Sequence, residues 1–266
     1  MQRRLSSNLV RAHTAYRDST QSIRQRTQGV LRQSWLDLPD YRDGNVEAFA
    51  QQAARVVRAG QRATATLTAA FTEQAAREVT GVTRRGVYDL SRLDALRDGV
   101  DPVEEYLRPG HQVWYELSLG VAFAAAVEHG LNRAMTLSAT DLQLAKTDAS
   151  FQSFQQDDRV LAYERQAGDN PCDLCSLAEG QISKADEVMP IHDNCACDAV
   201  PVFDPDVAAS AKSIDEVQAL ADTATDARVA FADARTPTDP AALPDHVAAQ
   251  REKNLRITAK WNDRYR

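Results

Sequence analysis

The sequence predicts a mainly α-helical protein with a small α+β Cys/His module, and three observations support this fold class. Turn-forming residues are scarce, since 11 glycines and 10 prolines make up about 8% of 266 residues, against a usual share of about 12%. Apolar residues recur at helical spacing over much of the first half of the chain. All four cysteines lie between Cys172 and Cys197. We therefore expect a multi-helix domain over residues 1–156, a zinc-knuckle-like module with a short β-hairpin over residues 157–205, and a helical tail over residues 206–266.

Residues 1–37 are expected to form one long helix, because a weakly apolar stripe recurs at alternating steps of four and three residues. The stripe consists of Leu5, Leu9, Ala12, Tyr16, Ser19, Ile23, Thr27 and Val30. Turn-forming residues at 39–44 end this helix. A second helix is expected to begin with Asn45 as its N-cap and to reach about Glu78. Small residues in its stripe, such as Gly60, would let neighbouring helices approach closely.

Three further helices are expected before residue 156. A short one covers residues 90–96, and another begins at Asp101, an acidic N-cap followed by proline. The Pro-Gly pair at 109–110 is expected to interrupt that helix. A long central helix then covers residues 111–150, and antiparallel neighbours supply each other's core.

The character of the sequence changes after residue 156. Short apolar runs at 160–164 and 199–203 are typical of strands, and turn-forming residues at 168–171 follow the first of them. The tail is Ala/Asp-rich and helical in pattern to about residue 234. Three prolines then form a stiff linker before a basic terminal helix.

Charge is unevenly distributed along the chain, although the net charge of −7 is ordinary. Residues 1–37 carry seven arginines against two aspartates, residues 198–250 carry ten acidic against three basic residues, and residues 251–266 are basic again. This asymmetry indicates either solvated helix faces or contact with nucleic acid or an acidic protein surface. The candidate contact residues are Arg3, Arg4, Arg11, Arg17, Arg24 and Arg26.

The cysteines and one histidine have the spacing of a metal site. Two thiols three residues apart can bind one tetrahedral ion, and a second Cys/His group some twenty residues later can complete the site. The five candidate ligands are Cys172, Cys175, His192, Cys195 and Cys197. Five candidates for four positions favour a closed, structural zinc site over a catalytic one. Ligation by both Cys195 and Cys197 requires a turn, because residues two apart on a strand face opposite sides.

Other interpretations of these residues stay open. The cysteines could form disulfides or remain free thiols. A redox-active Cys-x-x-Cys needs a βαβ context that the preceding helices do not offer. His192-Asp193-Asn194 leaves a zinc-dependent nuclease or DNA-modifying enzyme as the alternative function, but we expect no enzyme, because no further catalytic motif is present. No apolar stretch approaches the roughly 20 residues of a membrane span.

Four segments of the sequence together resemble the phage Mu F-like minor head (head morphogenesis) proteins of tailed bacteriophages. They are Tyr163-Glu164-Arg165, Cys172-x-x-Cys175, Met189-Pro190-Ile191-His192-Asp193-x-Cys195-x-Cys197 and Val200-Pro201-Val202-Phe203. Many members have Pro after the His and Arg between the last two cysteines, where this chain has Asp193 and Ala196. The resemblance covers about 40 of the 266 residues.

This resemblance implies a structural, low-copy component of the virion. The expected location is the capsid interior near the portal, after assembly in the host cytoplasm. The expected partners are the portal protein, together with scaffold or capsid protein and the packaged DNA. The expected role is in head assembly and in DNA packaging or ejection.

Overall fold

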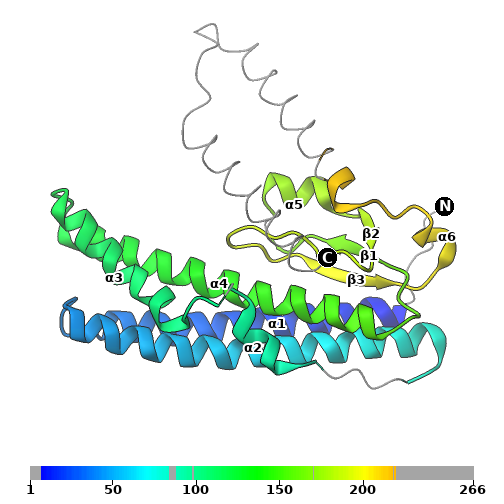
Figure 1. Cartoon of the computed structure of the whole chain (residues 1–266), viewed down its shortest axis with the longest axis horizontal. Coiled ribbons are helices and arrows are strands. Elements are labelled where there is room, and N and C mark those ends of the chain that lie inside the picture. The colour runs from blue at the N-terminus through cyan, green and yellow to red at the C-terminus, as the bar shows by residue number, and fades with distance from the viewer. Residues whose placement is uncertain (1–6, 84–87, 98, 170, 218, 220–266) are drawn as a thin grey trace, which may run out of the picture. The chain divides into compact units, whose positions relative to one another are not determined.

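Helices make up most of the computed structural model, and one small three-stranded sheet accompanies them (Figure 1). The predicted fold class is therefore confirmed. The described residues are 7–83, 88–97, 99–169, 171–217 and 219. The predicted Pro-rich linker, the basic terminal helix and most of the acidic helical segment lie outside them. No helix within the described ranges combines the length and apolar character of a membrane span.

The described residues fall into two compact units. The first contains residues 7–153 together with 193–195, and the second contains residues 154–192 and those from 196 onward. The first unit is helical, whereas the sheet and the short helices that flank it belong to the second.

The two long N-terminal helices, α1 (Ser7–Leu36) and α2 (Asp43–Thr80), pack against each other and agree closely with the expected ranges. The prediction that Asn45 is the N-cap of α2 is wrong. The N-cap position lies three residues earlier, at Arg42, which makes no side-chain cap, and the helix begins at Asp43. Asp40 organises this turn instead, because its carboxylate accepts hydrogen bonds from the backbone N–H of Arg42 and the side-chain amide of Asn45. These two bonds lower the pKa of Asp40.

The 3-10 helix η1 (Leu90–Ala95) lies where a short helix was expected. Helix α3 (Pro102–Ser118) begins as expected, with the carboxylate of Asp101 accepting the N–H of Val103. The predicted interruption at 109–110 and the single helix over 111–150 are both wrong. Helix α3 continues through Pro109, the chain reverses around Gly120 in the left-handed region (φ 79°), and α4 covers Phe123–Gln156. A proline removes one backbone donor from a helix, yet α3 continues here with both Pro109 and Gly110 buried.

The core of the helical unit joins residues from α1 to α4. It is formed by Leu31, Trp35, Phe49, Ala50, Ala53, Val57, Tyr106, Val113, Ala126, Leu131 and Ala134. The indole of Trp35 packs edge-on against Phe49 and donates its N–H to the carbonyl oxygen of Val127 at 3.1 Å. Close approach depends on glycines, as expected for Gly60, where a Cβ atom would lie 2.7 Å from Thr27 Oγ1.

Gly110 provides the sharpest test of this packing. A Cβ atom there would lie 2.2 Å from Cγ1 of Val46, a β-branched side chain that cannot rotate freely out of the way. We expect Gly110→Ala to lower the free energy of unfolding by about 1–3 kcal/mol. The matched control is Gly29→Ala, at an open position within α1, which should raise it by about 0.5–1 kcal/mol. Urea unfolding followed by circular dichroism measures both, and equal effects would contradict the packing argument.

Two buried carboxylates on α4 hold η1 and α3 in place. Asp148 accepts hydrogen bonds from the Tyr88 hydroxyl at 2.7 Å and from Arg92 at 2.7 and 3.0 Å. One heptad earlier, Asp141 accepts from the Tyr106 hydroxyl at 2.6 Å and pairs with Arg97. Burial and the neighbouring Asp141 carboxylate raise the pKa of Tyr106 well above its ordinary value, so its hydroxyl remains a donor.

The sheet of the second unit has β1 at its centre. Strand β1 (Ala162–Gln166) pairs antiparallel with β2 (Ile182–Lys184) and with β3 (Asp198–Val202). Both expected strands are thus present with shifted ends, and β2 was not expected. Helix α5 (Asp173–Ala178) lies between β1 and β2 in the chain, and α6 (Pro205–Ala208) follows β3.

Candidate metal centre

The pairing of β1 with β3 brings the two cysteine-bearing segments to the same end of the sheet. Gln166, the last residue of β1, pairs with Asp198, the first residue of β3. The chain that leaves β1 towards Cys172 therefore starts beside the chain that enters β3 from Cys197. Gly168 permits a close approach here, because a Cβ atom at this position would lie 2.6 Å from the carbonyl oxygen of Ala196.

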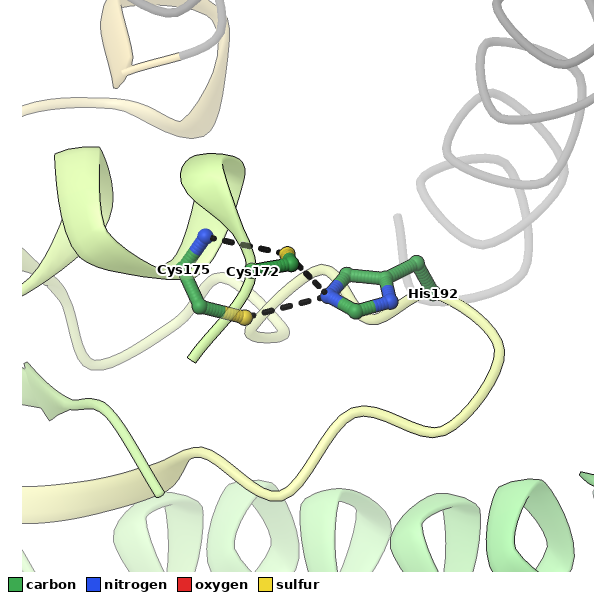
Figure 2. Close-up of side chains that lie close together, drawn as sticks. All are labelled: Cys172, Cys175 and His192. Carbon is green, nitrogen blue, oxygen red and sulfur yellow. Dashed lines mark hydrogen bonds between the residues drawn. The ribbon is translucent and has the colours of Figure 1, made fainter. Parts of the chain in front are cut away.

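Helix α5 presents the first two thiols. Cys172 is its N-cap residue, and the Cys172 Sγ accepts the backbone N–H of Cys175 at an N···S distance of 3.5 Å. The backbone N–H of Ser176 is bonded to the carbonyl oxygen of Cys172 at 2.9 Å, which closes the turn. Cys172 is exposed and Cys175 is buried. Because of this local turn both sulfur atoms point towards His192, as Figure 2 shows.

His192 completes the first group of candidate ligands. Its Nε2 atom lies 3.1 Å from Cys172 Sγ and 3.0 Å from Cys175 Sγ (Figure 2). In a tetrahedral zinc site the sulfur and nitrogen ligand atoms lie roughly 3.5–3.8 Å apart. An ion could therefore be accommodated if these atoms separate by about 0.5 Å.

Cys195 and Cys197 lie in the segment between His192 and β3. A turn at residues 193–194 directly precedes them, where Asn194 has a positive φ of 62°, a conformation that asparagine tolerates better than most residues. Residues 195–197 themselves belong to no strand, so the alternation of a strand does not apply to them. Both thiols are buried, and their sulfur atoms lie within 4.8 Å of each other and of Cys175 Sγ. Cys175 is therefore common to two overlapping groups of three ligand atoms.

The chemistry of this donor set fits a thiolate-rich metal site. It offers four sulfur atoms and one imidazole nitrogen, the ligand types of structural zinc sites. None of the four cysteines is joined in a disulfide. The Cys/His cluster, as we call these five residues, can hold a metal ion, and all five were expected from the sequence to be candidate ligands.

Arg165 on β1 also contributes to the site, although it was not expected to. Its guanidinium Nη2 lies 3.8 Å from Cys175 Sγ and 3.6 Å from Cys197 Sγ, and its Nη1 donates to the carbonyl oxygen of Pro190 at 2.9 Å. Alternation along the strand could have identified it, because Tyr163, Arg165 and Ala167 share one side and all three are buried. The expected strand ended at residue 164, two residues before the end of β1, and so did not include Arg165.

The arginines expected to contact DNA or portal are partly described. Arg11 and Arg26 are exposed on α1, whereas Arg17 and Arg24 are half-buried. The Arg11 guanidinium donates to the side chain of Asn8 at 2.5 Å. Arg3 and Arg4 lie outside the described residues. A role for these arginines in binding stays a prediction.

Comparison of the chain with protein-family models, with curated proteins and with solved structures finds no match.

Proposed function

We propose that this protein is a structural minor head protein of a tailed phage and that its Cys/His cluster binds one structural zinc ion. The observation that carries the proposal is the Cys/His cluster itself. A Cys-x-x-Cys turn and a His-x-x-Cys-x-Cys segment, the motif that resembles the Mu F-like family, meet at one end of a small sheet. A long helical unit precedes that sheet in the chain.

Zinc would stabilise the fold of this small unit by joining segments that are separate in the sequence. The three strands contain only five, three and five residues, and a sheet of this size buries little apolar surface by itself. Binding of zinc by deprotonated thiols and a neutral imidazole contributes directly to the free energy of folding. Cys172, Cys175 and His192 would hold the ion, with Cys195 or Cys197 as the fourth ligand. A closed set of four protein ligands leaves no position for a substrate, which favours a structural role over the zinc-dependent nuclease.

The proposed place of the protein is the capsid interior near the portal. The exposed arginines of α1, Arg11 and Arg26, would contact an acidic portal surface or the packaged DNA. Such contacts release counterions from DNA, so binding should weaken steeply as salt rises. Assembly with portal and with scaffold or capsid protein would take place in the host cytoplasm.

Co-sedimentation of the full-length protein with portal rings from the same phage genome tests this role. We expect the protein to sediment with portal, and to bind duplex DNA with an affinity that falls as salt is raised. Arg11→Gln combined with Arg26→Gln should reduce the slope of the salt dependence by about two.

The matched control replaces two exposed arginines of α2, Arg55→Gln with Arg62→Gln. This variant should retain the salt dependence of the parent protein if α1 carries the contact. Absence of both portal co-sedimentation and salt-sensitive DNA binding would refute the proposed role. Metal-dependent DNA nicking that is lost in His192→Ala would favour the nuclease instead.

A further inference from the structure

One thiol of the Cys/His cluster is open to solvent. Cys172 is exposed, whereas Cys175, Cys195 and Cys197 are buried. The rate at which a thiol exchanges with a disulfide in solution depends on access to the attacking sulfur atom as well as on its thiolate character. A small-molecule disulfide would therefore react first at Cys172.

A second thiol lies within reach of Cys172 on the same helical turn. Cys172 is the N-cap of α5, and Cys175 lies in its first turn. The bond from the backbone N–H of Ser176 to the carbonyl oxygen of Cys172, at 2.9 Å, closes this turn. Helical geometry places Cα atoms three residues apart at about 5 Å, within the range of about 4.4–6.8 Å that a disulfide spans. The two residues can thus be joined without rearrangement of the helix.

The two sulfur atoms also lie on the same side of the turn, next to His192. The Nε2 atom of His192 is 3.1 Å from Cys172 Sγ and 3.0 Å from Cys175 Sγ, and the three atoms lie within 4.8 Å of one another (Figure 2). All three residues belong to the sheet-containing unit. The arrangement that suits an ion therefore also places Cys175 Sγ where it can attack a sulfur atom at Cys172.

We propose that Cys172 and Cys175 form a reversible oxidation site through which a small-molecule disulfide releases the bound ion. The Cys172 thiolate attacks one sulfur atom of the small-molecule disulfide, which forms a mixed disulfide and releases one small-molecule thiolate. The Cys175 thiolate then attacks Cys172 Sγ, which forms the Cys172–Cys175 bond and releases the second small-molecule thiolate. The protein loses two electrons and the small molecule gains them. Disulfide sulfur atoms carry no negative charge, so the pair can no longer hold an ion.

Oxidation would weaken the sheet-containing unit. Ligation by Cys172 and His192 joins residues 20 apart in the chain, whereas the new disulfide joins residues 3 apart. A cross-link stabilises a fold more when it closes a longer stretch of chain. Exchange of the long link for the short one leaves α5 without its tie to the segment that precedes β3.

This inference rests on the proposed zinc binding and adds regulation of the same site. The host cytoplasm, in which assembly is proposed to take place, keeps thiols reduced. The ion would therefore be held during assembly, and the pair would be oxidised only outside the cell. Each chain reacts once, so the pair is a switch and not a redox catalyst.

Treatment of the zinc-loaded, full-length protein with glutathione disulfide tests the proposal. We expect the bound zinc to be released and two of the four thiols to be lost. Peptide mapping by mass spectrometry should identify a disulfide between Cys172 and Cys175. Dithiothreitol with added zinc should restore both the thiols and the bound ion.

Cys172→His keeps a residue type that binds zinc but removes the exposed thiol. Under glutathione disulfide it should release zinc about tenfold more slowly than the parent protein, because the remaining thiols are buried. The matched control is Ser176→Ala, at an exposed position of α5, which should release zinc at the parent rate. Mapping of the disulfide in the parent protein keeps the assignment testable even if Cys172→His does not fold.

The possible failures are distinguishable. If the reduced parent protein holds no zinc, the proposed zinc binding is wrong, and peptide mapping still decides whether the pair oxidises. If the protein holds zinc but keeps both the ion and all its thiols under glutathione disulfide, the oxidation site is wrong while zinc binding stands. A disulfide that maps to Cys195 and Cys197, or a stable mixed disulfide at Cys172 without loss of the ion, would also overturn it.

Discussion

Replacement of Cys175 by serine is expected to abolish tight zinc binding and to unfold the sheet-containing unit. Cys175 Sγ belongs to both groups of candidate ligand atoms, so its loss removes the atom that connects Cys172 and His192 with Cys195 and Cys197. Structural zinc contributes about 10–16 kcal/mol of apparent free energy in small zinc modules. Even part of that contribution exceeds what three short strands provide. Elemental analysis and denaturant unfolding of the full chain, with and without a strong chelator, measure the effect.

Ser176→Ala is the control for this experiment, since Ser176 is the exposed neighbour of Cys175. It should retain one zinc per chain and the parent unfolding transition. Chelator added with reductant should reproduce the Cys175→Ser phenotype in the parent protein. Full retention of folding under those conditions would show that folding of the sheet-containing unit does not depend on a bound metal ion.

Asp148→Asn is expected to lower the free energy of unfolding of the helical unit by about 3–5 kcal/mol. The side chain of Asp148 is fully buried and receives two N–H groups of Arg92 and the hydroxyl of Tyr88. Its loss leaves a partly buried guanidinium without the carboxylate that balances its charge. Urea unfolding followed by helical circular dichroism measures the change.

Asp94→Asn provides the matched comparison, because Asp94 also pairs with an arginine, Arg58, but its side chain is 75% exposed. Surface pairs of this kind contribute about 0–1 kcal/mol. A large difference between the two variants is expected because only Asp148 is buried. Similar effects would show that the carboxylate on α4 does not hold η1 in place.

Periodicity predicts α1 and α2 well because each has one apolar stripe over many turns. It fails at the α3–α4 connection, where the Pro-Gly pair at 109–110 is a stronger local stop signal than the residues around Gly120. The decisive factor is tertiary, since Gly110 packs directly against Val46 of α2. The sequence around residue 110 contains no pattern that predicts the contact with Val46.

The spacing in the sequence is enough to predict the five members of the Cys/His cluster as candidate ligands, because four cysteines rarely lie this close together unless they share one site. Alternation along β1 places Arg165 on the buried side of the strand, but its contact with Cys197 depends on the register of β1 with β3, which the sequence does not give. The roles of the two carboxylates on α4 cannot be predicted from the sequence either. Asp141 and Asp148 resemble ordinary surface acids until Tyr106 and Tyr88 are brought to them by packing.

The hydrogen bond from Trp35 to Val127 has a consequence for the order in which the chain folds. Its partners are 92 residues apart, so during synthesis α1 and α2 must wait for α4 before the core around Trp35 can close. Long-range contacts of this kind are slow to form. The members of the Cys/His cluster span only 26 residues, so ion capture closes a short loop soon after that segment is made. Folding of the chain therefore combines one slow, long-range step with one fast, local step.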